Sequence, residues 1–231
     1  MQPAPETSPV MSQDQPHSMR EEILINVTPQ ETRVATLENG MLQEIFVERV
    51  KNKGIVGNIY VGKVVRVLPG MQAAFVEIGL ERTAFLHARD LRQRNDDGPQ
   101  LQQMDTETCI SSLVTEGQDI VVQVVKDPLG TKGARLSGQI SIPSRNLVYL
   151  PDSDYMGVSQ RIQEAETRER LLESLNRSKE KAGVPGGFIV RTAGETALDE
   201  EIQSDMHFLV RVWEKVQSRR KENRVPSLLH A

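Results

Sequence analysis

Between Gly57 and Val148 the sequence breaks into short runs of strand-forming residues, and this spacing constrains the fold more than any other feature. Turn residues interrupt the runs at Pro69-Gly70, at Gly79 and across residues 128–133. Five short strands within fewer than about a hundred residues are typical of a small closed barrel, and the OB-fold is the commonest five-stranded form. The predicted strands are Ile59–Leu68, Ala73–Ile78, Thr83–His87, Ile120–Val125 and Arg135–Ile142.

The chain ahead of this region predicts a tail followed by a small meander. Residues 1–18 are rich in Pro, Ser and Gln, and indicate either a disordered tail or sequence upstream of a start at Met19. Asn39-Gly40 is a strong hairpin signal. It separates the second and third of three strand-like runs, which are Ile23–Val27, Thr32–Leu37 and Leu42–Val50. Within the barrel region, the polar stretch Arg92–Thr108 predicts a long surface loop.

The residues after the barrel predict an α/β layer. Ser159 is a candidate N-cap for a helix that carries Ile162 in its apolar stripe and ends near Gly183. A second helix is indicated by apolar residues at three- and four-residue steps from Leu198 to Val216, with acids at its start and bases at its end. Gly187–Val190 between the helices predicts a buried strand, so the barrel is expected to be an insert in this layer.

Charge and cysteine content narrow the classes of function. The net charge of −4 argues against a polybasic nucleic-acid coat. Cys109 is the only cysteine, which excludes an internal disulfide and a cysteine-built zinc site, and suits a reducing cytoplasm. No apolar run approaches the length of a membrane span, and no signal-peptide pattern opens the chain. A cytoplasmic location is therefore expected.

Two phenylalanines are candidates for stacking on nucleic-acid bases. Phe75 and Phe85 lie on consecutive predicted strands, and antiparallel pairing across Gly79 would place both rings on one face. Aromatic rings flanked by cations are the means by which proteins hold single-stranded RNA. Phenylalanine is more often a core residue, and from the residues alone that alternative is favoured. The candidate cations are Lys63, Arg82, His87, Lys126, Lys132 and Arg135.

The segment GGFIVRTAGE contains a candidate phosphate site. Arg191 follows the predicted buried strand, and Thr192 follows Arg191. A guanidinium fork beside a hydroxyl suits a terminal phosphate. A surface arginine that caps the next helix is the ordinary alternative, and the residues alone favour it.

Two acidic groups resemble catalytic clusters but have simpler explanations. Asp152 and Asp154 neighbour a proline and a serine, and are interpreted as turn formers. Asp199, Glu200, Glu201 and Asp205 belong to the first turns of a predicted helix, where acids are ordinary. The sequence therefore predicts no catalytic residue and no metal ligand in this chain.

Two long strings carry a resemblance to a known family. GNIYVGKVVRVLPGMQAAFVEIGLERTAFLHARDL and GQDIVVQVVKDPLGTKGARLSGQISIPSRNLVYLP resemble the RNA-binding barrel of ribonucleases G and E, with the ribonuclease G branch the more similar. The resemblance covers residues 19–231. It implies a mixed α+β fold in which residues 57–148 form an OB-fold barrel of the S-one type. That barrel would be inserted into an incomplete RNase H-like subdomain made of residues 19–56 and 149–231.

The resemblance also implies roles for particular residues. Phe75 and Phe85 would stack on RNA, and Lys132 would contact it. Arg191 and Thr192 would form a pocket for the RNA 5′-monophosphate. With the resemblance, this role for Arg191 is favoured over the helix-capping role that the residues alone favoured. Val148 would line that pocket, and Ser144 stands where the ribonuclease E branch has glycine, so that one wall differs.

The resemblance places hydrolysis outside this sequence. In the family, acidic residues of a later DNase I-like domain hold Mg²⁺, and a CxxC zinc link joins subunits into homo-oligomers. Neither motif is present here, so no cofactor is expected in this chain and a monomer is expected. The main hypothesis is the RNA-binding and 5′-end-sensing portion of a single-strand-specific endoribonuclease that processes rRNA and mRNA. The alternatives are a stand-alone RNA-binding protein without nuclease activity and a metal-dependent nuclease that uses the acids present.

We predict that this chain does not cleave RNA by itself. Incubation with a 5′-monophosphorylated single-stranded RNA and Mg²⁺ should leave the RNA intact on a denaturing gel, because the acids present are explained as turn and helix-start residues. A parallel sample with a chelator is the control. Cleavage that the chelator abolishes would contradict the prediction and favour the third hypothesis.

Overall fold

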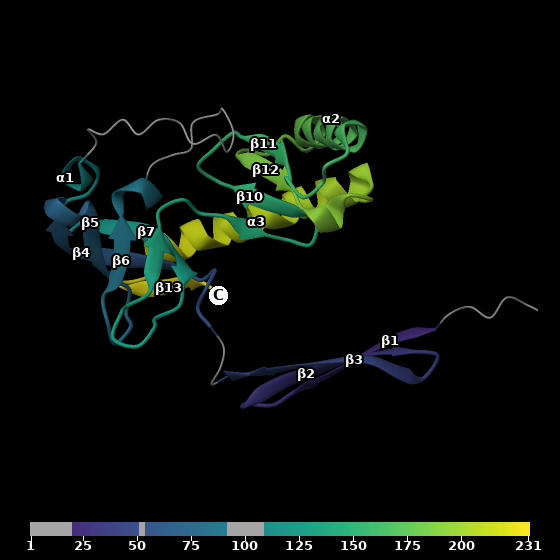
Figure 1. Ribbon diagram of the computed structural model, residues 1–231, viewed down its shortest axis with the longest axis horizontal. Coiled ribbons are helices and arrows are strands. Elements are labelled where there is room, and N and C mark those ends of the chain that lie inside the picture. The colour runs from purple at the N-terminus through teal and green to yellow at the C-terminus, as the bar shows by residue number, and fades with distance from the viewer. Residues whose placement is uncertain (1–19, 51–53, 92–108) are drawn as a thin grey trace, which may run out of the picture. The chain divides into compact units, whose positions relative to one another are not determined.

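The computed structural model describes residues 20–50, 54–91 and 109–231 (Figure 1). Contacts divide the chain into two compact units, residues 1–54 and residues 55–231, and each is described by itself. The predicted tail of residues 1–18 and the predicted loop of residues 92–108 lie outside the described residues. Among the helices of the described residues, none combines the length and the apolar character needed to cross a bilayer.

The first unit is an antiparallel sheet with the strand order β1-β2-β3. Asn39 and Gly40 form the turn between β2 and β3 with φ values of 52° and 81°. A two-residue hairpin turn of this type requires positive φ at both positions, which Asn-Gly tolerates. The predicted meander is confirmed. Its strands are β1 (Glu21–Val27), β2 (Glu31–Glu38) and β3 (Met41–Arg49).

The second unit begins with a closed five-stranded barrel. Its strands run in the order β4-β5-β6-β8-β7, and antiparallel pairing of β4 with β7 closes the ring. The β6–β8 pair is parallel and the other pairs are antiparallel, so the barrel is mixed, as an OB-fold is. The strands are β4 (Ile59–Leu68), β5 (Ala73–Glu77), β6 (Ala84–His87), β7 (Asp119–Lys126) and β8 (Arg135–Ser137). Short helices η2 (Pro69–Met71), η3 (Ala88–Asp90) and α1 (Ile110–Leu113) connect them.

Two glycines permit close backbone contacts inside the barrel. A Cβ on Gly133 would lie 2.0 Å from the Thr83 carbonyl oxygen, and one on Gly62 would lie 2.7 Å from the Glu77 carbonyl oxygen. Real Cβ atoms do not approach a carbonyl so closely. The close approach of the chain at Gly133 to Thr83 and at Gly62 to Glu77 therefore requires a residue without a Cβ at both positions.

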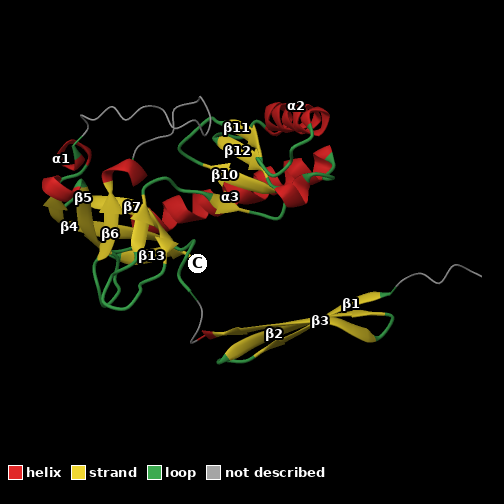
Figure 2. Cartoon of the chain, viewed as in Figure 1, coloured by secondary structure: helices red, strands yellow, loops and turns green. Residues whose placement is uncertain are grey.

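The rest of the second unit is a four-stranded sheet with two long helices. The sheet order is β11-β12-β10-β9, with β11 parallel to β12 and the other pairs antiparallel. Figure 2 shows α2 and α3 beside these strands. The strands are β9 (Ile142–Pro143), β10 (Leu147–Leu150), β11 (Met156–Val158) and β12 (Gly187–Val190), and the helices are α2 (Ala165–Ala182), η4 (Thr192–Gly194) and α3 (Asp199–Glu222).

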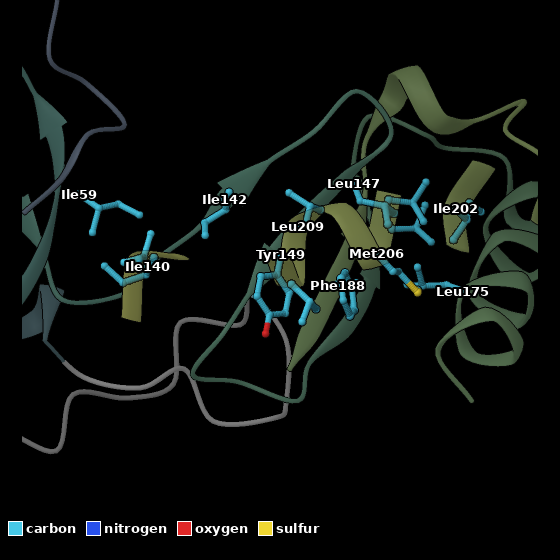
Figure 3. Packing of buried hydrophobic residues seen from close by; sticks show 14 of the residues in the cluster. Ile59, Ile140, Ile142, Leu147, Tyr149, Leu175, Phe188, Ile202, Met206 and Leu209 are labelled. Atoms are coloured by element: carbon cyan, nitrogen blue, oxygen red, sulfur yellow. The ribbon is translucent and has the colours of Figure 1, made fainter. Parts of the chain in front are cut away.

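The helices cover one face of this sheet and form its core. Along β10, Leu147 and Tyr149 are buried, whereas Val148 and Leu150 are only partly buried. Tyr149 stacks beside Phe188 of β12 with ring centroids 4.9 Å apart (Figure 3). Full burial of one such large side chain stabilises the fold by about 1.5–3 kcal/mol. The helices contribute Leu171, Leu175, Ile202, Met206 and Leu209 to the same cluster.

Two local predictions after the barrel are wrong. The first long helix begins at Ala165, so Ser159 is not its N-cap and Ile162 precedes it. The reason is tertiary: Ser159 N donates to the Val190 carbonyl at 2.8 Å, and the Arg168 guanidinium donates to the carbonyls of Ser159 and Ile162. The predicted strand Arg135–Ile142 also divides, because the chain leaves the barrel after β8 and joins the second sheet as β9.

A C-terminal strand was not predicted. β13 (Ser227–His230) pairs antiparallel with β4 and extends the barrel sheet. The last strand of the chain is therefore paired with residues 59–61, although the residues of the α/β layer lie between the two strands in the sequence. The union of residues 19–56 with residues 149–231 in one subdomain stays a prediction.

We predict that Gly133→Ala destabilises the second unit by about 1–3 kcal/mol, since the added methyl group overpacks against the Thr83 carbonyl. The free energy of unfolding from urea denaturation measures the effect. Gly70→Ala is the matched control, because a Cβ there has no atom within 4 Å and should change stability little. Equal stability of the two variants would show that the β6–β8 contact is looser than described.

Candidate functional site

Phe75 and Phe85 meet on the surface of the barrel. They are direct partners across the β5–β6 pair, and their ring centroids are 6.1 Å apart at an interplanar angle of 70°. Both rings are partly exposed, and neither belongs to the buried cluster of the barrel. The predicted shared face is confirmed. The core interpretation, which the residues alone favoured, does not match this placement.

Three cations continue the line of the two rings. Arg66 is the partner of Phe75 across β4–β5, and Arg135 is the partner of Phe85 across β6–β8. Lys126 of β7 is in turn the partner of Arg135. Directly paired residues place their side chains on the same face of a sheet. The five residues Arg66, Phe75, Phe85, Arg135 and Lys126 therefore form one row across the barrel, called here the aromatic row.

The sequence missed Arg66 as a member of this row. Lys126 and Arg135 were candidate cations, but Lys63 was proposed in place of Arg66 from the same strand. Lys63 instead bonds to Asp119 at 2.6 Å. A register shift between Val64 and Arg66 sets which cation is placed opposite Phe75. Counting outward from the Pro69-Gly70 turn, which joins β4 to β5, would have indicated the neighbourhood of Arg66, but not the shift.

His87 lies at the end of the same strand as Phe85, with ring centroids 6.4 Å apart. Partial burial and the nearby Arg89 and Arg135 lower the pKa of its imidazole, while Asp90 opposes them. Its Nδ1 accepts a hydrogen bond from the Arg89 amide at 3.2 Å. The lowered pKa and the acceptor role of Nδ1 both favour the neutral imidazole, which suits stacking more than pairing with phosphate.

Arg135 of the row, and the candidate cations Lys132 and Arg82 outside it, have protein partners or lie in turns. Asp90 binds Arg135 at 2.9 Å, which orients the guanidinium and offsets part of its charge. Lys132 is exposed in the turn from Leu129, where the two residues exchange backbone hydrogen bonds of 3.2 and 3.0 Å. Arg82 donates to the Gly130 carbonyl and ties this turn to the β5–β6 loop. Lys132 thus lies on the β7–β8 connection, outside the aromatic row.

A second group of polar residues gathers where β12 ends and β10 begins. Arg191 directly follows β12, and its guanidinium donates to the Ser144 carbonyl. Its backbone amide donates to the Asn146 carbonyl at 2.8 Å. Thr192 opens η4, and its hydroxyl is 3.4 Å from that of Ser159. Arg191 is exposed, and the structure brings it together with both Thr192 and Ser144.

Val148 is placed beside this group by the sheet. It is the partner of Ile189 in the β10–β12 pair. Ile189 precedes Arg191 by two residues, and alternate residues of an extended chain point to the same side. Val148 is partly buried on the sheet face that the helices leave uncovered. All four residues predicted for the phosphate pocket therefore lie within one local region.

The Ser144 hydroxyl is turned toward α3. It donates to an oxygen of the Asp205 carboxylate at 2.7 Å and accepts from the Leu147 amide at 3.1 Å. The same Asp205 oxygen accepts from the Asn146 amide at 3.1 Å. Within the described residues, Ser144 bonds to Arg191 through its main-chain carbonyl. The sequence offered no signal for Asp205, which was grouped with the acids at the start of a helix.

Three other acids of the two clusters, Asp199, Glu201 and Asp154, have structural partners. Asp199 accepts from Ser174 and pairs with Arg177, and these bonds lower the pKa of its carboxyl. Glu201 accepts from the Leu198 amide at 2.8 Å. Asp154 is 3.7 Å from Lys179. Across residues 20–50, 54–91 and 109–231, no three His, Cys, Asp or Glu side chains are grouped to hold a metal ion.

Comparisons with known proteins identify the family to which this chain is related. The model of the ribonuclease E/G family matches residues 141–231. The chain is 53% identical to ribonuclease G of Haemophilus influenzae over 87% of its own length and 40% of that protein. It is 54% identical to ribonuclease G of Salmonella typhimurium over 88% of its length, and 37% identical to ribonuclease E of Nostoc over 89%.

The chain belongs to the ribonuclease E/G family. It spans about two fifths of the length of the ribonuclease G relatives that it matches.

Proposed function

We propose that this chain binds single-stranded RNA along the aromatic row and recognises an RNA 5′-monophosphate at Arg191 and Thr192. It would serve as the RNA-binding portion of a ribonuclease G-type endoribonuclease. The observation that carries the proposal is the aromatic row itself, in which two partly exposed rings are flanked by cations on both sides. The names of the relatives, ribonuclease G and ribonuclease E, support RNA as the class of partner.

The row has the chemistry that an unpaired strand requires. Every base presents an apolar face to an aromatic ring, so stacking on Phe75 and Phe85 tolerates many sequences. Arg66 and Lys126 stand at the two ends of the row and can pair with phosphates on either side of the stacked bases. Neighbouring strands are about 4.8 Å apart, so the row is long enough for a few nucleotides.

The cations of the aromatic row also explain how a chain with a net negative charge could bind RNA. A net charge of −4 opposes RNA binding by the chain as a whole. Salt screens charges that lie more than about 8–10 Å apart, so the nearest cations decide the potential at the rings. The proposed affinity therefore comes from placement of charge on one face of the barrel, and it should fall as salt rises.

Arg191 and Thr192 suit a terminal phosphate rather than an internal one. The guanidinium has five N–H donors, and the bond to the Ser144 carbonyl orients it while leaving donors available. A 5′-monophosphate carries a second negative charge that an internal phosphodiester lacks. A charge-assisted, forked bond from Arg191 with a hydroxyl bond from Thr192 would favour that end group.

We predict that replacing Phe75 and Phe85 together by alanine weakens binding of a short single-stranded RNA by about 1–3 kcal/mol for each lost stack. Fluorescence anisotropy with a labelled oligonucleotide measures the change. Phe208→Ala is the matched control, because Phe208 is an exposed phenylalanine on α3, outside the row. Unchanged affinity of the double variant with an intact circular dichroism spectrum would rule out the aromatic row as the binding surface.

We predict that Arg191→Ala removes a preference for 5′-monophosphorylated over 5′-hydroxyl RNA and leaves binding of the 5′-hydroxyl RNA nearly unchanged. The loss follows from removal of the charge-assisted bonds, which contribute about 1.5–3 kcal/mol. Competition between the two RNAs gives the ratio of dissociation constants. Arg211→Ala is the control, since Arg211 is an exposed arginine that donates to the His207 carbonyl within α3. Survival of the preference in Arg191→Ala would contradict the assignment.

A further inference from the structure

The turn between β9 and β10 is held from outside the sheet by one carboxylate. Asp205 of α3 accepts the Ser144 hydroxyl at 2.7 Å and the Asn146 amide at 3.1 Å, both on Oδ2. The Ser144 hydroxyl in turn accepts the Leu147 amide at 3.1 Å. Ser144 and Asn146 are about sixty positions from Asp205 in the sequence. Ser144 is partly buried and Asn146 is buried. Asp205 therefore holds this short turn from α3, in addition to the hydrogen bonds between Ser144 and Leu147 within the turn.

The same turn supplies the contacts of Arg191. Its guanidinium donates to the Ser144 carbonyl and its amide donates to the Asn146 carbonyl. The next turn also rests on it, because a Cβ on Gly194 would be 2.8 Å from the Asn146 carbonyl oxygen. Both carbonyls that orient Arg191 thus belong to residues whose hydrogen-bond donors are bound by Asp205.

We infer that Asp205 is a positioning residue for the 5′-phosphate site, which rests on the function proposed above. It fixes the Ser144 and Asn146 carbonyls, and these carbonyls hold the Arg191 guanidinium in one orientation, with Thr192 beside it. A guanidinium held in this way loses less conformational freedom when a phosphate binds. Asp205 acts through the turn and does not itself contact the phosphate.

The negative charge of Asp205 suggests an alternative role, in which its carboxylate weakens phosphate binding by electrostatic repulsion. A carboxylate near a phosphate site also repels the ligand, and removal of that repulsion would strengthen binding. Positioning and repulsion therefore predict opposite changes when the carboxylate is removed. The sign of the change in 5′-monophosphate preference decides between them.

The experiment compares Asp205→Ala, Asp205→Asn and Ser144→Ala in the full chain. Each is titrated with the same short RNA carrying a 5′-monophosphate or a 5′-hydroxyl. Positioning predicts that Asp205→Ala lowers the preference about fivefold or more, as expected for loss of a hydrogen-bonded anchor. Asp205→Asn keeps an oxygen acceptor and should retain most of the preference, and Ser144→Ala should be intermediate. Binding of the 5′-hydroxyl RNA should change less than about twofold in all three.

Glu214→Ala is the matched control, because Glu214 is an exposed acid on the same helix. A higher preference in both Asp205 variants would overturn the inference in favour of repulsion. An unchanged ratio in Asp205→Ala, or equal weakening of both RNAs, would overturn it as well, since the latter indicates a general loss of folding.

A second measurement separates failure of the clamp from failure of the proposed function. Wild-type protein without any 5′-monophosphate preference would overturn the proposed function. Amide hydrogen exchange tests the clamp without RNA: in Asp205→Ala, the amides of Asn146 and Arg191 should exchange at least about tenfold faster. Protection equal to that of the wild type at both amides would overturn the positioning role whatever the RNA results.

Discussion

Strand β4 is the element on which the second unit depends, because its two faces belong to two different cores. Ile59 and Val61 pack in the cluster with the α/β layer, whereas Tyr60 and Val64 pack inside the barrel. A strand directs successive side chains to opposite sides, so one extended segment can serve both clusters only if its register is kept. Slippage of β4 by one residue would exchange the two sets of side chains.

The hydrogen bonds of β4 keep that register. β7 and β13 pair with its first half, and β5 pairs with its second half. Gly62 lies between the halves and permits the close approach of β5. The barrel and the α/β layer are therefore joined by the packing of β4 as well as by the covalent chain. The aromatic row lies on the barrel, and the group around Arg191 lies on the α/β layer.

The two candidate sites use this framework in different ways. The aromatic row follows from strand register alone, since each of its members is the cross-strand partner of the next. The group around Arg191 instead depends on strand ends and one helix, with Asp205 reaching across to the turn of Ser144. A row on rigid strands suits contacts that tolerate sequence, and a hydrogen-bonded turn suits recognition of one end group.

The sequence by itself determined the local elements and several site residues. Alternation and turn residues predicted the barrel strands, the meander and Gly187–Val190, because these signals act between neighbours in the chain. The shared face of Phe75 and Phe85 followed from one hairpin. The tertiary structure alone decided the place of Arg66, the late start of α2 and the pairing of β13. It also turned the Ser144 hydroxyl toward Asp205. Each of these depends on a bulge or on hydrogen bonds between segments far apart in the chain, and no local pattern encodes which distant partner a polar group will meet.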